Sequence, residues 1–166
     1  MRKFILAILI FVSLILQLTV FNYIKVAGVK PDLILAIVIF NALINGSKEG
    51  AILGLVAGLA QDMMTGQFYG MNALSKMITG YIFGFAGRKL YRENILIPIL
   101  CLFFGSVINE SILFFLTYFI DLRISLIKAI QDKILPMAIY NSCLAPFIYS
   151  KFYDSSAKGL LSKVER

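Results

Sequence analysis

Long apolar stretches separated by short polar segments limit most strongly how this chain can fold. Of its 166 residues, 60% are hydrophobic and 15% are charged, whereas a soluble domain averages roughly 45–50% apolar residues. The charged residues gather between the apolar stretches, and a helix needs ~20 mostly apolar residues to span a bilayer. The pattern predicts an all-α integral membrane protein, a bundle of about six transmembrane helices.

The predicted bundle forms a single membrane domain over residues 1–166. The first apolar stretch is too long for the core of a cleavable signal, so we expect it to be retained as a span. An amphipathic connection before the last span is either an interfacial helix or the beginning of that span. The six spans are expected over residues 4–24, 32–45, 49–65, 72–86, 95–120 and 134–151.

The distribution of Lys and Arg predicts the orientation of the bundle. With six spans, ten of these residues fall on the side of the termini and five on the other side. Since cytoplasmic loops carry the excess of Lys and Arg, both termini are expected in the cytoplasm. We therefore attribute the net charge of +7 to the Lys and Arg residues that orient the spans in the membrane. No loop is long enough for a nucleic-acid-binding module, so no nucleic acid is expected as a partner.

The residue types needed for most catalysis are missing. The chain has no His and two Cys, which excludes Ser–His and Cys–His catalysis and leaves no ligand set for structural zinc. An intramembrane aspartyl protease would need two facing acids, and Asp62 has Glu110 as its only candidate partner. We therefore predict that the protein is not an enzyme and uses no metal and no cofactor.

Glycines four residues apart mark the third predicted span. Residues at this spacing share one face of a helix, so Gly50, Gly54 and Gly58 form a smooth groove. Small residues allow helices to pack closely in lipid, and the groove is expected to receive another helix. That helix belongs either to this chain, the commoner case, or to a partner. The fourth span repeats the spacing with Gly80 and Gly84.

Polar side chains interrupt the predicted spans. Such groups usually pair or face a cavity, so they are expected either to join helices or to line a ligand site. Asp62 and Lys76 flank one turn at similar distances. Either they pair, or Lys76 extends to the interface while Asp62 bonds backbone amides. The intramembrane polar residues are Gln61, Asp62, Asn72, Lys76, Asn109, Glu110 and Asn141.

Several short motifs occur in a fixed order over nearly the whole chain. The most specific is a Gln-Asp-x-x-x-Gly element at the end of the glycine-rich third span. A Pro-Asp pair opens the second span, a glycine precedes Asn-Ala-Leu at residues 72–74, and an Asn precedes a late Ala-Pro pair. Together these motifs resemble the MreD family of rod shape-determining proteins, and the residues that match are Pro31, Asp32, Gln61, Asp62, Gly66, Gly70, Asn141 and Pro146.

The resemblance implies a part in the bacterial cell-elongation machinery, in the cytoplasmic membrane. MreD-like proteins act with the bitopic protein MreC and alongside RodA, its transpeptidase partner and the actin-like MreB filament. The implied mechanism is that of a non-catalytic scaffold that offers a groove to a partner's single span and supports peptidoglycan synthesis and rod shape. The glycine face of the third span suits this role physically.

A more distant likeness gives a second hypothesis. The family resembles the substrate-binding S components of vitamin-importing ECF transporters, which are also small six-helix membrane proteins. On this interpretation the chain is the substrate-binding subunit of a small-molecule transporter. Asp62, Asn72, Lys76 and Glu110 would then line a pocket.

Overall fold

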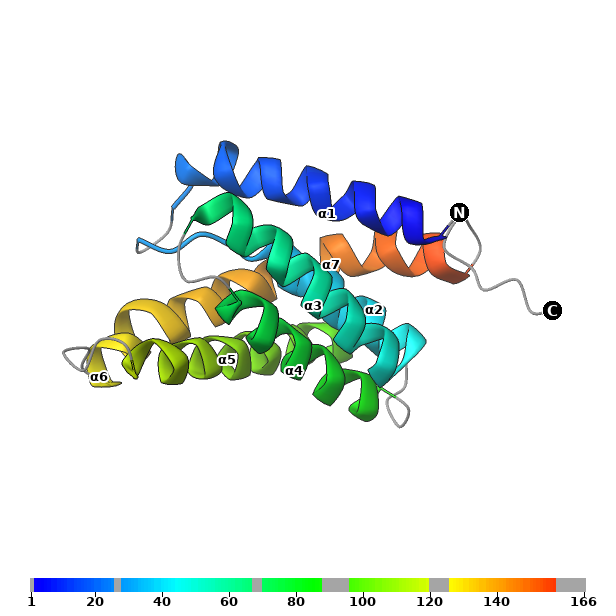
Figure 1. Ribbon diagram of the computed structural model, residues 1–166. Helices are drawn as coiled ribbons and strands as arrows, with labels where there is room; N and C mark the ends of the chain where they lie inside the picture. The colour runs from blue at the N-terminus through cyan, green and yellow to red at the C-terminus, as the bar shows by residue number, and fades with distance from the viewer. Residues whose placement is uncertain (1, 26–27, 67–69, 88–95, 120–125, 158–166) are drawn as a thin grey trace.

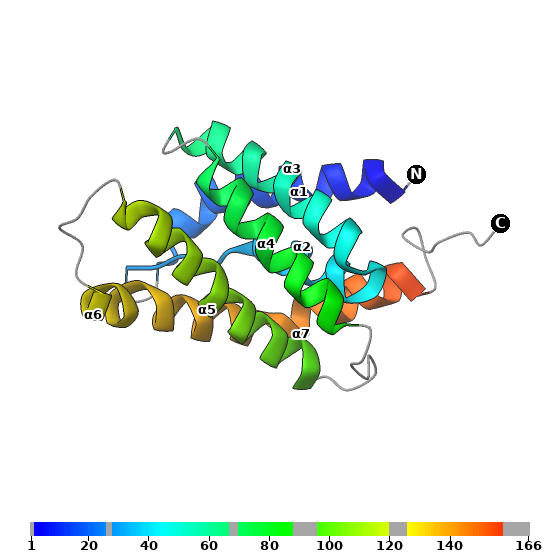
Figure 2. The ribbon, with the colours of Figure 1, turned by 60° about the horizontal axis from the view of Figure 1, so that its bottom comes forward.

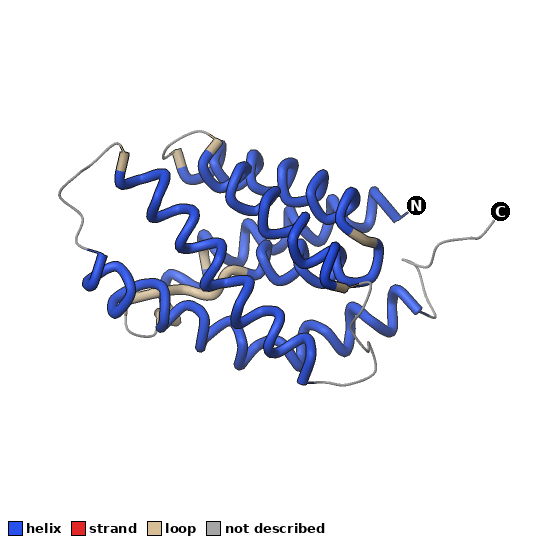
Figure 3. The backbone as a smooth tube through the Cα atoms, turned by 90° about the horizontal axis from the view of Figure 1, so that it is seen from below, coloured by secondary structure: helices blue, strands red, loops and turns tan. Residues whose placement is uncertain are grey.

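A computed structural model describes residues 2–25, 28–66, 70–87, 96–119 and 126–157. In these ranges the chain is mainly helical and contains no strand, as Figure 3 shows from below. The helices are α1 (Arg2–Leu18), the 3₁₀ turn η1 (Val20–Asn22), α2 (Leu33–Asn45), α3 (Ser47–Thr65), α4 (Met71–Ala86), α5 (Leu96–Tyr118), α6 (Leu126–Ala129), the π-helical segment η2 (Ile130–Ile134) and α7 (Leu135–Ala157).

Helix α2 forms the centre of the bundle. Every residue from 34 to 43 is buried, and α1, α3, α4, α5 and α7 all contact this helix. A helix that is apolar on all sides is expected in such a position, and α2 is apolar apart from Asn41 and Asn45. In Figures 1 and 2, α3 and α4 lie together on one side of it, and α5 and α7 on another.

The glycines of α3 and α4 bring these two helices into backbone contact. A Cβ atom on Gly54 would overlap the main chain of Lys76, and one on Gly58 would overlap the main chain of Ala73. The third glycine, Gly50, lies against the carbonyl of Gly80. The internal alternative for the glycine groove is therefore confirmed. The implied use of this face for a partner's span is wrong, because α4 already fills it.

The ends of some helices differ from the expected spans. Helix α1 ends at Leu18 and is followed by η1, so it is shorter than the predicted 4–24; the Thr19 hydroxyl bonds the Ile15 carbonyl there. The segments α6, η2 and α7 follow one another without a break. Residues 126–133 thus belong to the last helix, which is one of the two alternatives for the connection. Pro146 lies inside α7 and does not end it.

Large apolar side chains cover the outside of the bundle. Phe4, Ile52, Phe85, Phe115 and Phe147, from five different helices, are all more than half exposed. Such a surface is typical of contact with a membrane or another protein. By length and composition, α5 is the one described helix that could cross a membrane, and Phe4–Leu18 and Leu33–Asn45 are shorter apolar helices. The six-span arrangement stays a prediction.

The contact between α3 and α4 predicts that Gly54→Ala destabilises the protein. The added methyl group meets backbone atoms that cannot rotate away, and overpacking of this kind costs about 1–3 kcal/mol. Thermal unfolding of the purified protein in detergent measures the effect. Ile52→Ala on the exposed face of the same helix is the control and should unfold near the wild-type temperature. Equal melting of the Gly54 variant and wild type would contradict the close contact.

Candidate functional site

A buried ion pair lies at one end of the bundle. The Lys76 ammonium is 2.7 Å from Oδ2 of Asp32, and the two side chains are 0% and 8% exposed. Oδ1 of Asp32 caps α2 by accepting from the Leu35 amide at 2.9 Å, and it also accepts from Gln17 at 3.1 Å. The Asp32 amide donates to Oδ1 of Asn141 at 2.8 Å. The pair thus joins side chains from α1, α4 and α7 to the beginning of α2.

The predicted pairing of Asp62 with Lys76 is wrong, and so is the extension of Lys76 to the interface. Asp62 instead accepts from the amides of Gly70 (3.0 Å), Asn72 (3.3 Å) and Ala73 (3.1 Å). It also accepts from the Asn72 side chain at 2.8 Å. The first amides of a helix have no partners within it and favour a negative charge. The alternative in which Asp62 bonds backbone amides is therefore confirmed.

Two amides connect α5 to its neighbours. Asn109 accepts from the Ser75 hydroxyl of α4 at 2.7 Å, and Asn141 of α7 donates to the Ser106 hydroxyl at 2.8 Å. All four residues are buried. The predicted interhelical role of these two polar residues is confirmed by these contacts.

The remaining buried acid pairs with a residue that the sequence did not single out. Glu110 is 3% exposed, and its Oε2 lies 3.0 Å from the ammonium of Lys133, which is 56% exposed. Lys133 belongs to η2, a π-helical segment of a kind often found at functional sites. Gln17 was also missed. The sequence could have indicated a role for Gln17, because it is the only amide side chain within α1.

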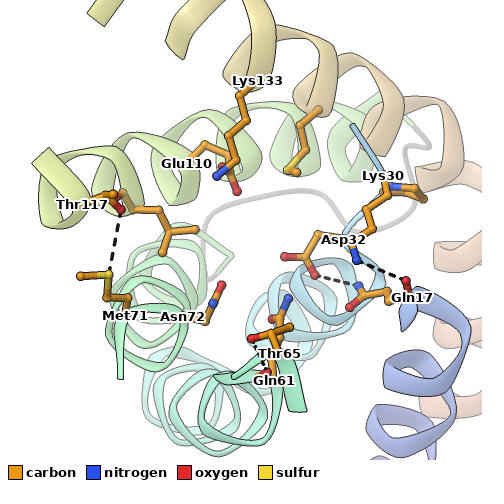
Figure 4. Close-up of a pocket in the computed structure, with 13 residues that line it drawn as sticks. Gln17, Lys30, Asp32, Gln61, Thr65, Met71, Asn72, Glu110, Thr117 and Lys133 are labelled. Atoms are coloured by element: carbon orange, nitrogen blue, oxygen red, sulfur yellow. Dashed lines mark hydrogen bonds and ion pairs between the residues drawn. The ribbon is translucent and has the colours of Figure 1, made fainter. Parts of the chain in front are cut away.

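The ion pairs border a cavity of about 360 Å³ at this end of the bundle (Figure 4). Of the four residues expected to line a transporter pocket, Asn72 and Glu110 line it, and Asp62 and Lys76 do not. No cluster of three His, Cys, Asp or Glu that could hold a metal occurs in the described ranges. The cavity is lined by Gln17, Lys30, Pro31, Asp32, Gln61, Thr65, Met71, Asn72, Glu110, Leu113, Thr117, Lys133 and Met137.

A helix bundle that is apolar outside and pairs its charges inside has the character of a small membrane protein. The family model for the rod shape-determining protein MreD matches residues 1–154. The chain therefore belongs to the MreD family. No curated protein and no solved structure matches it, so the likeness to ECF S components stays a prediction.

Membership in this family gives the chain a role in determining rod shape. The MreD family is a non-enzymatic family of membrane proteins that works with the cell-shape machinery. The glycine contacts and buried polar pairs join the helices of the bundle to one another.

The network around Asp62 predicts that Asp62→Asn lowers the stability of the α3–α4 hairpin. The amide of Asn keeps one acceptor oxygen and turns an NH₂ group towards amides that need an acceptor. We expect a loss of about 1–3 kcal/mol, measured by unfolding in detergent. Asp132→Asn removes an equal charge at an exposed position of η2 and is the matched control. Equal effects of the two changes would contradict the capping role.

Proposed function

We propose that this chain is a non-catalytic scaffold of the bacterial cell-elongation machinery. It binds an MreC-like bitopic protein and, with RodA and its transpeptidase partner, supports peptidoglycan synthesis. The observation that carries the proposal is the use of the polar residues. Asp62, Asn109 and Asn141 bond to other helices or to helix ends, as structural groups do, and the family is one of shape-determining proteins.

The carrier alternative has less support. It placed four polar residues in a pocket, and two of them are instead engaged in structural contacts: Asp62 caps α4, and Lys76 pairs with Asp32. A shape-determining family also favours the scaffold over a transport subunit.

We propose that the chain crosses the cytoplasmic membrane six times with both termini in the cytoplasm. The beginning of α1 and the end of α7 lie at the same end of the bundle (Figure 1), which supports an even number of crossings. The excess of Lys and Arg on the side of the termini supports the orientation. The polar end, with Asp32 and Glu110, then faces the outside of the cell.

The partner's span is proposed to bind on the outer apolar surface. The glycine face is excluded because α3 and α4 are in backbone contact there. Packing against the outside of the bundle needs no rearrangement of the core. The outward side chains of α3, among them Ile52, Val56 and Leu59, form one such surface, and α1 and α5 offer others.

Site-specific photo-crosslinking in living cells tests this proposal. A photoreactive residue replaces one exposed apolar residue at a time, namely Phe11 in α1, Val56 in α3, Phe104 in α5 or Phe147 in α7. Each variant must first restore rod shape to cells depleted of the protein. We expect an MreC-like protein to be captured from positions on one face and lipid from the others, which serve as matched controls. Full restoration of rod shape with no such capture from any position would contradict the scaffold.

A further inference from the structure

The cavity at the polar end is not explained by the scaffold role. A half-open cavity of about 360 Å³ lies there, between the ends of several helices. Ligand sites range from about 300 to 1,000 Å³, so this cavity has the size of a small-molecule site. Its wall combines side chains from α1, α3, α4, α5, η2 and α7 with residues 30–32.

The charges in the wall are not all balanced by one another. Asp32 pairs with Lys76, and Glu110 pairs with Lys133. Lys30 has no ion pair with a carboxylate in the described part of the chain, and its ammonium lies 3.4 Å from the Gln17 carbonyl, a long contact for a hydrogen bond. Figure 4 shows Lys30 beside Asp32 and Gln17 at the border of the cavity. The wall thus offers a cation that is available to an anionic group.

Two buried acceptors in the wall have no hydrogen-bond donor among the described residues, and one of them, Oε2 of Glu110, is compensated by its ion pair with Lys133. Oε1 of Gln61 is buried and accepts no hydrogen bond from any described residue, although almost all buried polar atoms in proteins have a partner. Gln61 lies on α3, below Asn72 and Asp32 in the view of Figure 4. A ligand with an O–H or N–H group would supply the missing donor.

We propose that this cavity binds a small polar molecule that carries at least one phosphate or carboxylate group and at least one O–H or N–H group. The anionic group binds Lys30, and the donor group bonds Oε1 of Gln61. The apolar side chains of Met71, Leu113 and Met137, which complete the wall, contact its carbon atoms. The ligand comes either from solution or from the headgroup of an anionic lipid, since both present the same chemistry.

Calorimetry on the full-length protein in phosphatidylcholine nanodiscs tests the site. The probes are glycerol 3-phosphate and glutamate, each of which carries an anionic group and a donor. We expect saturable binding of at least one probe and a loss of at least tenfold in affinity for Lys30→Gln and for Gln61→Met. Lys48→Gln changes an exposed lysine at the beginning of α3, outside the cavity, and should bind as wild type does.

A second set of nanodiscs, with phosphatidylglycerol in place of phosphatidylcholine, distinguishes the two sources. If an anionic headgroup occupies the site, the probes bind more weakly in phosphatidylglycerol nanodiscs than in phosphatidylcholine nanodiscs, and Lys30→Gln removes this difference. Equal affinities in the two kinds of nanodisc identify a solute as the ligand. The absence of binding of either probe in both kinds of nanodisc, or equal losses for the Lys30 and Lys48 variants, would overturn the site. No partner protein is present in this assay, so its failure is distinct from a failure of the scaffold.

Discussion

The ion pair between Asp32 and Lys76 is the interaction on which the polar end of this bundle depends. A charge without a partner is costly in a buried position of a membrane protein, so each of these residues requires the other. Their contact fixes the beginning of α2, and bonds from Gln17 and Asn141 to Asp32 add α1 and α7. Gly54 lies against the main chain of Lys76, so the same residue also sets the approach of α3 to α4. One pair therefore positions helices that are far apart in the sequence.

The helices and the glycine contacts were predictable because they follow from local sequence. The apolar stretches have the length of helices, and Gly50, Gly54 and Gly58 share a face whatever surrounds them. The partner of Lys76 was not predictable in this way. Spacing around a turn suggested Asp62, 14 residues away, but amides of α4 donate to that carboxylate, and the true partner lies 44 residues away. Lys133 was missed because its role depends on how the last helix packs against Glu110.

The two proposed functions use different parts of the molecule. A scaffold needs an outer surface that can receive a partner's span, and the exposed apolar side chains of α1, α3 and α5 provide it. A ligand site needs a concave space with polar groups that lack partners within the protein, and the cavity at the polar end beside Lys30 and Gln61 is such a space. The ion pairs of Asp32 and Glu110 border that space, so the network that holds the helices also shapes the cavity.

A double-mutant cycle on the ion pair tests the central claim most directly. Asp32→Asn keeps a residue that can cap α2 and leaves the Lys76 ammonium buried without its counter-charge. Lys76→Met leaves the Asp32 carboxylate buried without its counter-charge. Each single change should cost about 3–5 kcal/mol of stability. The double variant, measured by unfolding in the same detergent, should cost clearly less than the sum of the two. Additive effects, or single changes that leave stability near wild type, would contradict the account of a bundle organised by this pair.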